Sequence, residues 1–585
     1  MQIVHKTSSV LRKLRLGILL ASLLFLFASS SCSGQVETYT PALPTEEIPL
    51  PTPEPTLTQT FTNEQISPPY FAWIDPALPV VAQNMISQFP DIDITTNRDL
   101  ALLTFSSAMS DQVGSWTYLL VAPFYSSLEN IRSSDISAIW DSGSIDIPGY
   151  DRLIASDETV HHLSQFWGNP SENAISIMSP EDILEDLWYD STALAIIPFD
   201  QLEPSYKVIS IDSQNPLIPS EEQEYFLNFP IYLSATDSDL FQSLKVSNIS
   251  NYDSSKLSSV AITGVTALVR NTASIIEERG IHYPAEDIRD LLISADITHI
   301  NNEVPFKSDC PIPDPQQDNL LFCSSDSYIE LLKWIGTDIV ELSGDHFADF
   351  GAEAMIHSLE LYREHNFITY GGGSNLQAGL DPVITIHNGN KFAFIGCNAK
   401  GYEGYATASE TAPGASRCDF DWMLPKITQL AADGYIVIAT LQHEEVDDFF
   451  PVYLQNYDFR RISEAGASIV SGSQAHHPQG VEISGSKFIH YGLGNLFFDQ
   501  WYLAQYNPDI HVNKDKAFID FHYFYNGEYI NTRLIPLQFV DNAKPRLMTE
   551  EEKEPFLFEV YRASKWNNKW IYLYPTEYYK FLENQ

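Results

Sequence analysis

The sequence is poor in basic residues: 33 Lys and Arg stand against 77 Asp and Glu, for a formal net charge of −44 at pH 7. Proteins that bind nucleic acid use Lys and Arg to neutralise phosphates. The shortage of these residues therefore argues against nucleic acid as a partner. The same acidity would repel a polyanionic polymer unless cations or a local basic pocket mediate the contact.

The N-terminal region lacks an apolar run long enough to cross a bilayer comfortably, which takes roughly 20 residues. Its apolar run covers only residues 16–28, after a basic start and with no acidic residue before Glu37. This pattern is typical of a secretory signal peptide, here residues 1–31. The Ser-Ser-Ser-Cys sequence that ends at Cys32 resembles a bacterial lipobox, with serine at the position where a larger aliphatic residue is usual.

Acylation of Cys32 would tie the chain to a membrane, so the sequence predicts an exported lipoprotein at a bacterial cell surface. The alternative is an ordinary cleaved signal peptide followed by an incidental cysteine.

Cysteine is scarce, and no C-x-x-C pair indicates a cysteine-built zinc site. Beyond Cys32 four cysteines remain, an even number that in an exported chain indicates two disulfides. Three pairings are open. The simplest joins Cys310 to Cys323 and Cys397 to Cys418, and this is the pairing that we predict.

The chain of 585 residues is too long for one typical core, so two or more domains are expected. Residues 32–69 are rich in Pro, Thr and Glu, which favours an extended spacer. Residues 70–247 alternate strand-like and amphipathic runs, which indicates an α/β domain. A polar linker at 248–259 would precede a second domain, residues 260–540, and a C-terminal tail, residues 541–585.

The second domain also alternates between strand and helix patterns. Short apolar runs predict strands at residues 260–262, 338–340, 367–370, 392–395, 435–439 and 488–491. Helices are expected at 352–366 and 421–433, the latter with Pro425 in its first turn.

The segment 468–500 concentrates candidate site residues, including His476 and His477. Two apolar runs in it read as strands that end in polar turns, and α/β domains build their sites from such loops. The alternative is that the two histidines cap a turn before Pro478.

This segment resembles the end of the CapA family, the poly-gamma-glutamate capsule synthesis proteins, which are similar to calcineurin-like metallophosphatases. That family ends in G-x-H-x-H-x-x-Q followed by Y-S-L-G-N-F-x-F-D. The chain has Gly-Ser-Gln-Ala-His-His-Pro-Gln at 472–479 and Tyr-Gly-Leu-Gly-Asn-Leu-Phe-Phe-Asp at 491–499. Gln474 stands where the family has a histidine.

Earlier family blocks match in the same order. The N-L-E block corresponds to Asn301-Asn302-Glu303, which could also be a turn before Pro305. The N-N-H-x-x-D-x-G block corresponds to residues 344–351, with Asp345, His346 and Asp349. Asp349 could instead cap the following helix, or do both.

Two blocks match less fully. The family's G-D-v-M-L-G-R appears at 264–270, where Val265 replaces the metal-binding Asp and Arg270 is kept. Its H-W-G-x-E-Y lies near His443, but aligning Glu445 with the family Glu puts Leu441 at the family His.

The resemblance implies a metallophosphatase-like αββα sandwich and a divalent metal (Mn, Fe or Zn) that activates water. The implied metal ligands are Glu303, Asp345, His346 and His476. The implied catalytic residues are His443, His476 and Asp349, the last orienting His346. Five further residues would line the pocket: Asn301, Arg270, Gln474, His477 and Asn495. Because Val265 and Gln474 replace expected ligands, metal affinity would be lower, and whether the chain is an enzyme stays open.

The first domain carries a looser resemblance. Residues 121–124, 136–140 and 195–199 resemble a type 2 periplasmic binding protein. An unrelated α/β spacer is the alternative. No cluster of Arg or Lys marks an anion pocket there, so no ligand is predicted.

The sequence therefore predicts an α/β protein with a binding-protein-like domain followed by the sandwich. The leading hypothesis is a surface lipoprotein in synthesis or attachment of a capsule or poly-gamma-glutamate-type polymer, by metal-dependent hydrolysis or transfer. Its partners would be the membrane, the polymer or other capsule-synthesis proteins. The alternative is a non-catalytic lipoprotein that binds a polymer or solute through a degenerate metal site.

Overall fold

The computed structural model describes residues 68–564 except 219–223, 238–239, 242–243, 401–405 and 501–512. The predicted signal peptide, Cys32 and nearly all of the predicted spacer lie outside the described residues. None of the helices in the described part of the chain is long and apolar enough to cross a membrane.

The first domain is built on a mixed sheet that runs in the order β2-β1-β3-β10-β4-β8-β6-β7. Its longest strand, β4, is the spine of the sheet, because β8, β9, β10 and β11 all pair with it. The strands are β1 (Tyr70–Ile74), β2 (Ile92–Ile94), β3 (Leu103–Ser106), β4 (Asp111–Pro123), β5 (Asn130–Ile131), β6 (Arg152–Ala155), β7 (Ser176–Ile177), β8 (Ala193–Pro198), β9 (Tyr206–Ile211) and β10 (Asn228–Ala235). The helices are α2 (Val80–Ser87), α3 (Ser133–Ser142), α4 (Asp157–Trp167) and α5 (Pro180–Tyr189).

The stretch expected to link the domains is packed onto the first domain. β11 (Ile249–Ser250) pairs with β4, and Ile249 is fully buried. The Asn251 side chain accepts a hydrogen bond from the Thr117 backbone N–H at 2.8 Å and donates one to the Thr117 carbonyl at 2.9 Å. These bonds satisfy the backbone of β4, so the polar residues hold the connection in place.

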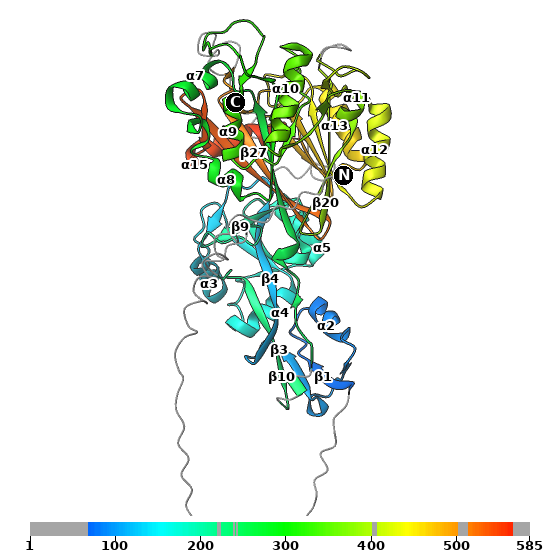
Figure 1. Cartoon of the computed structure of the whole chain (residues 1–585). Coiled ribbons are helices and arrows are strands. Elements are labelled where there is room, and N and C mark those ends of the chain that lie inside the picture. The colour runs from blue at the N-terminus through cyan, green and yellow to red at the C-terminus, as the bar shows by residue number, and fades with distance from the viewer. Residues whose placement is uncertain are drawn as a thin grey trace, which may run out of the picture.

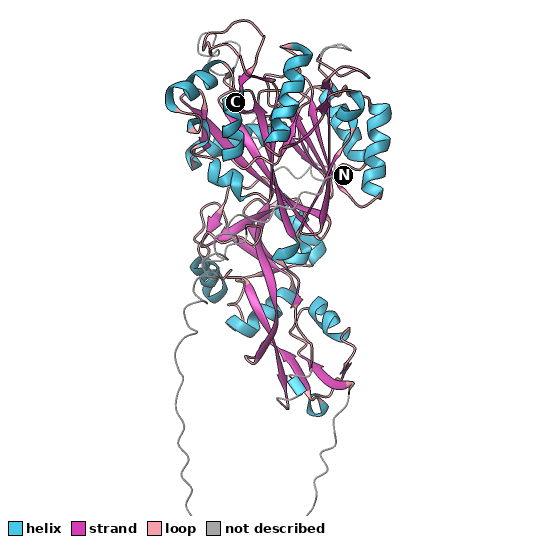
Figure 2. Cartoon of the chain, viewed as in Figure 1, coloured by secondary structure: helices cyan, strands magenta, loops and turns pink. Residues whose placement is uncertain are grey.

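The second domain is an αββα sandwich, which confirms the predicted fold class (Figures 1 and 2). One sheet has the order β17-β16-β13-β12-β27-β28-β29, with β26 beside β12, and the other has the order β19-β20-β22-β23-β25-β24. The first sheet comprises β12 (Leu257–Thr266), β13 (Ile297–Asn302), β16 (Ile339–Glu341), β17 (Ile368–Tyr370), β26 (Asn495–Phe497), β27 (Lys516–Tyr525), β28 (Glu528–Val540) and β29 (Lys544–Leu547). The second comprises β19 (Val383–His387), β20 (Asn390–Asn398), β22 (Ile436–Gln442), β23 (Ile469–Ser473), β24 (Val481–Ile483) and β25 (Phe488–His490). The helices are α7 (Arg270–Arg279), α8 (Arg289–Ser294), α9 (Ile329–Trp334), α10 (Gly351–Glu364), α11 (Leu376–Leu380), α12 (Phe420–Ala432), α13 (Tyr453–Ala465) and α15 (Glu550–Ala563).

The alternation of side chains along β20 shows how the layers form. Phe392 and Phe394 join the core between the two sheets, whereas Ala393 and Ile395 join a separate core with α12 and α13. Both faces of this strand are therefore buried, as expected for a strand covered on one face by a sheet and on the other by helices.

Helix α12 begins earlier than the sequence pattern indicated. The Asp419 side chain accepts hydrogen bonds from the backbone N–H groups of Asp421 and Trp422 and caps the helix. Pro425 therefore lies in the second turn, and the expectation that it falls in the first turn is wrong.

The two predicted disulfides, Cys310–Cys323 and Cys397–Cys418, are both present. The segment beyond residue 540, expected as a tail, contributes β29 and α15, and Phe556, Leu557 and Val560 of α15 are buried in the main core.

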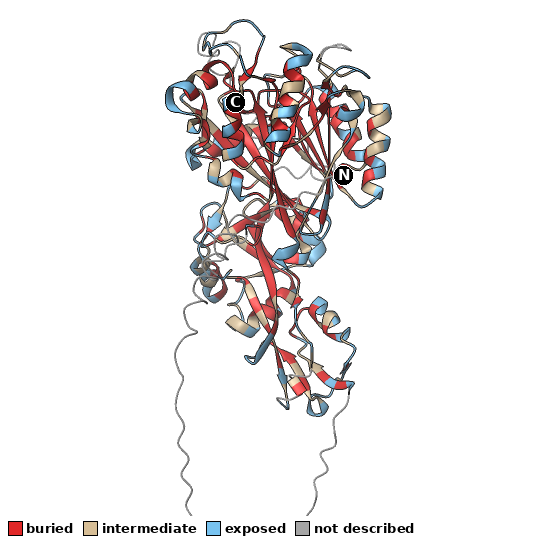
Figure 3. Ribbon diagram, viewed as in Figure 1, coloured by how far each residue is buried: buried red, intermediate tan, exposed pale blue. Residues whose placement is uncertain are grey.

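The two domains share that core. Leu119, Val121 and Trp188 of the first domain belong to the same apolar cluster as β27 and β28 of the second. The Phe199 and Tyr525 rings meet edge to face with centroids 5.1 Å apart. Figure 3 shows buried ribbon continuing from β4 into the second domain.

Candidate metal centre

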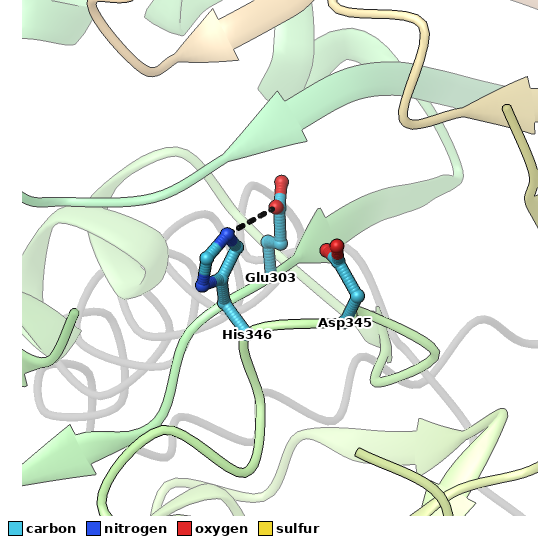
Figure 4. A group of neighbouring side chains, drawn as sticks. All are labelled: Glu303, Asp345 and His346. Carbon is cyan, nitrogen blue, oxygen red and sulfur yellow. Dashed lines mark ion pairs between the residues drawn. The ribbon is translucent and has the colours of Figure 1, made fainter. Parts of the chain in front are cut away.

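Three neighbouring chain segments carry the candidate ligands to one end of the sandwich. Glu303 directly follows β13, Asp345 and His346 follow β16, and His476 follows β23. Strands β13 and β16 are parallel neighbours, so the loops after them emerge at the same edge of the sheet. Figure 4 shows Glu303, Asp345 and His346 gathered around one point.

The distances define a compact cluster. One donor atom from each of Glu303, Asp345 and His346 lies within 4.8 Å of the other two. His346 Nε2 is 4.0 Å from Glu303 Oε1, and His476 Nε2 is 3.8 Å from Glu303 Oε2. The Glu303 carboxylate therefore lies between two imidazoles from different sheets. The sandwich brings together the four residues that were predicted as ligands.

Among the described residues Glu303 makes only long ion-pair contacts, those to His346 and His476. It is 1% exposed, and neither of its carboxylate oxygens accepts a hydrogen bond from a residue that the structure describes. Burial and the neighbouring Asp345 raise its pKa well above the usual range. A buried carboxylate without a partner is strongly unfavourable. Two carboxylates and two imidazoles form a donor set suited to Zn, Mn or Fe, so these residues fit a divalent cation.

Each imidazole is held so that its Nε2 faces Glu303. His346 Nδ1 donates to Asp349 Oδ2 at 2.8 Å, and His476 Nδ1 donates to Asn495 Oδ1 at 2.8 Å. Burial and the charge of Lys514 lower the pKa of His476 to about 3, so its ring is neutral. A neutral ring whose other nitrogen is engaged by an oxygen is the form that binds metals.

Asp349 does not cap the helix that follows it. Its carboxylate also accepts the backbone N–H of Phe322 at 2.7 Å, and helix α10 has no side-chain cap. Its contacts are those of a residue that orients His346.

Val265 and Gln474 stand at the two positions where the family has metal ligands, and each has a different environment. Val265 is buried in an apolar cluster with Phe322 and Phe498. The Phe322 ring contacts the His346 ring at 4.8 Å between centroids, and the Phe498 ring contacts that of His476 at 5.3 Å. Apolar packing therefore supports the imidazoles on this side.

The second replacement, Gln474, is polar. Its side-chain amide lies 3.1 Å from Asp345 Oδ1 and 3.1 Å from the Lys400 ammonium. Its backbone has a φ of 73°, and that of His476 has a φ of 52°. Left-handed backbone at such residues is uncommon and often accompanies functional sites.

The structure adds Gln442, which the sequence reasoning missed. This last residue of β22 donates from Nε2 to Asp345 Oδ1 at 3.1 Å and accepts from Ser473 Oγ at 2.9 Å. The adjacent His443 instead bonds to Asp458 of α13 at 2.9 Å, and its ring packs on Phe459. Successive residues at a strand end face opposite sides, a rule that could have indicated Gln442.

The remaining predicted pocket residues differ in how they lie relative to the cluster. Asn301 donates to Glu341 Oε2 at 2.8 Å, and its own side-chain oxygen has no partner. His477 faces away from the cluster, with Nδ1 2.6 Å from the Pro478 carbonyl and its ring against Phe449. Arg270 lies on the far side of Phe322 and Phe498.

An αββα sandwich with carboxylates and imidazoles gathered at strand ends defines a metallophosphatase-like domain. Residues 259–500 match the family described as "Bacterial capsule synthesis protein PGA_cap". This match places the domain, rather than the whole chain, with the CapA family of capsule synthesis proteins.

The curated relatives agree with this assignment. The chain is 24% identical over 311 residues to capsule biosynthesis protein CapA of Bacillus anthracis, covering 52% of this chain and 72% of that protein. It is 23% identical over 270 residues to PGA biosynthesis protein CapA of Bacillus subtilis strain 168, covering 46% and 68% respectively.

Similar solved structures are more distant. A hypothetical protein from Thermus thermophilus is 12% identical with a TM-score of 0.30, covering 48% of this chain and all of that one. An ABC-type phosphate transport receptor from Vibrio cholerae is 12% identical with a TM-score of 0.24, covering 30% of this chain and 90% of that one. Scores this low do not establish a shared fold, so the resemblance of the first domain to binding proteins stays a prediction.

Proposed function

We propose that this chain is a cell-surface lipoprotein that acts in synthesis or attachment of a capsule or poly-gamma-glutamate-type polymer by metal-dependent hydrolysis or transfer. The observation that carries the proposal is the Glu303 carboxylate, buried without a hydrogen-bond donor between the Nε2 atoms of His346 and His476. A divalent ion would supply the missing positive charge.

The residues that would hold the ion are Glu303, Asp345, His346 and His476. A bound divalent metal lowers the pKa of a water ligand and so supplies a nucleophile at neutral pH. Asp349 and Asn495 fix the two rings in the ligating tautomer. Gln442 holds one oxygen of Asp345 in place. These contacts would orient the ligands before an ion binds, which limits the reorganisation that binding requires.

The proposed location rests on the N-terminal sequence. A signal peptide, an acylated Cys32 and a Pro-rich spacer would place the folded domains outside the cell, at the membrane where capsule polymer is assembled.

Metal analysis tests the proposal directly. The soluble chain without residues 1–32 would be dialysed against Mn²⁺ or Zn²⁺, and its metal content measured by mass spectrometry. We expect Glu303→Gln to lower affinity by at least about tenfold, because even residues behind the ligands contribute that much. Asp520→Asn is the matched control, because Asp520 is a buried carboxylate bonded to a histidine, His490, outside the cluster. Equal metal content in the wild type and in Glu303→Gln would refute the proposed centre.

A second function is favoured by Val265 and Gln474, which replace ligands of the family with neutral side chains. In this alternative the chain binds polymer or solute without hydrolysis. Purified chain that retains polymer but takes up no ion after Mn²⁺ or Zn²⁺ loading would support it.

A further inference from the structure

A cavity lies near the candidate centre, and Arg270 is one of the residues that line it. It has a volume of about 360 Å³ and lies between the start of α7 and the loop closed by the Cys310–Cys323 disulfide. Its wall combines apolar residues, among them Leu268, Ile312 and Phe350, with polar ones that include Asp314 and Gln317. Ile312 is 92% exposed at the rim, so the cavity opens to solvent. Among the described residues that line it, Arg270 is the one cation.

Arg270 is a buried charge without an anionic partner. Its side chain is 4% exposed, its Nε has no acceptor, and no described carboxylate lies within ion-pair distance of its guanidinium. The guanidinium instead lies over the Phe322 ring, 4.5 Å from the centroid, and 5.8 Å from that of Phe498. Burial lowers the pKa of Arg270, and the charges of Asp499 and Glu303 only partly oppose this.

A guanidinium in this environment favours an anion. Burying a charge is unfavourable unless it is paired, and Arg is suited to bidentate binding of carboxylate and phosphate. The Arg270 backbone has a φ of 48°, a conformation that is rare for residues other than glycine. The fold therefore retains an unpaired charge in a strained backbone at the edge of an open cavity.

The two phenylalanines link this cavity to the centre. Phe322 contacts both Arg270 and His346, and Phe498 contacts both Arg270 and His476. One pair of aromatic rings thus separates the arginine from the proposed ligands. A substrate held by both Arg270 and the centre would have to extend past these two rings.

We propose that Arg270 and the cavity bounded by the Cys310–Cys323 loop form an anion subsite, which binds a carboxylate or phosphate group of a substrate whose reacting bond lies at the Glu303 centre. This inference deepens the function proposed above, and it rests on that function for the identity of the polymer. A γ-linked glutamate unit has one free carboxylate, which is attached directly to the α-carbon of the polymer backbone beside two methylene groups. Arg270 would bind that carboxylate, and the apolar residues of the wall would contact the methylene groups. The subsite would also provide the local positive charge that a chain of net charge −44 needs to hold a polyanion.

Binding measurements on the soluble chain test the subsite. Isothermal titration calorimetry would use a short γ-linked glutamate oligomer, the same oligomer with its free carboxylates amidated, and inorganic phosphate. We expect Arg270→Gln to weaken binding of the charged oligomer by about tenfold or more, the effect of losing a charge-assisted hydrogen bond. The amidated oligomer should bind the wild type and the variant equally weakly.

Arg279→Gln is the matched control. Arg279 lies on the same helix and also stacks on an aromatic ring, that of Tyr283, but it pairs with Asp541 and does not line the cavity. It should bind the oligomer as the wild type does. Arg270→Lys keeps the positive charge but loses the paired N–H donors of the planar guanidinium. Its affinity for the charged oligomer should fall between those of the wild type and Arg270→Gln. If thermal unfolding shows that Arg270→Gln does not fold, the binding of Arg270→Lys is compared with that of the wild type instead.

The outcomes separate the subsite from the proposed function. Phosphate binding that depends on Arg270, without oligomer binding, would assign the subsite to a phosphoryl group. Wild-type affinity in Arg270→Gln, or no binding of either probe to the wild type, would overturn the subsite. Metal content measured in the same samples reports on the centre independently. Normal metal content without Arg270-dependent binding refutes the subsite alone, and absent metal with Arg270-dependent binding refutes the metal-dependent function alone.

Discussion

The Glu303 carboxylate, which accepts no hydrogen bond from the described residues, leads to an uncommon prediction: replacing this residue with Gln should stabilise the metal-free protein. A buried polar group left without its hydrogen-bond partners destabilises a protein by about 1–3 kcal/mol, and by more when it is charged; the neutral Gln side chain removes the additional penalty of the charge. Removing that penalty should raise the unfolding temperature by roughly 2–4 °C for each kcal/mol in a domain of this size. Because burial and Asp345 raise the pKa of Glu303 in the folded state, the unfolded state loses this proton first as pH rises. The stability gained from Glu303→Gln should therefore grow above about pH 4.5, the ordinary range of a Glu carboxyl.

The assay is calorimetric unfolding of chelator-treated protein at several pH values, repeated with added Mn²⁺ or Zn²⁺. Glu341→Gln is the control, because Glu341 is equally buried at the neighbouring strand end but accepts hydrogen bonds from Asn301 and Ser343. It should lose about 1–3 kcal/mol, since a buried donor is left without its acceptor. Added metal should stabilise the wild type more than it stabilises Glu303→Gln. The reasoning fails if Glu303→Gln destabilises the metal-free protein as much as Glu341→Gln does.

Two further predictions concern the export of the chain and its disulfides. Cys32→Ser should move the full-length protein from the membrane to the soluble fraction on cell fractionation, and a variant that stays membrane-bound would refute the lipid anchor. Replacing both Cys310 and Cys323 with Ser should lower the free energy of unfolding by roughly 3 kcal/mol, as expected for closing a loop of this length. Denaturant titration measures that loss, and a smaller loss than about 1 kcal/mol would show that the disulfide contributes little.

Much of the sandwich could be predicted because both its sheets are buried. Strands such as β22 and β23 read as continuous apolar runs, and each ends in polar residues where the chain leaves the core. That rule alone places Glu303 and His476 at strand ends. Their convergence does not follow from spacing, because they belong to different sheets whose packing is set by long-range contacts. It was the family resemblance that brought them together.

Other features depended on contacts that no local pattern reveals. His443 had the more reactive side chain, but the end of β22 directs Gln442 to Asp345 and turns His443 to Asp458. The charged segment around α15 read as a tail, because its buried residues are spaced among many exposed Glu residues. The face of α15 that is buried becomes apparent only in the folded structure, where it packs into the core that the two domains share.

The residues at the two positions where family ligands are replaced, Val265 and Gln474, are both neutral. Val265 extends the apolar cluster behind His346 and His476, and Gln474 places a neutral amide between Asp345 and Lys400. Glu303 and Asp345 remain as the carboxylates of the donor set, and together they balance the charge of one divalent ion. The contacts that orient the imidazoles, through Asp349 and Asn495, are intact. The proposed cation would account for a buried Glu303 that accepts no hydrogen bond from the described residues, because without a cation a neutral or apolar side chain there would make the protein more stable.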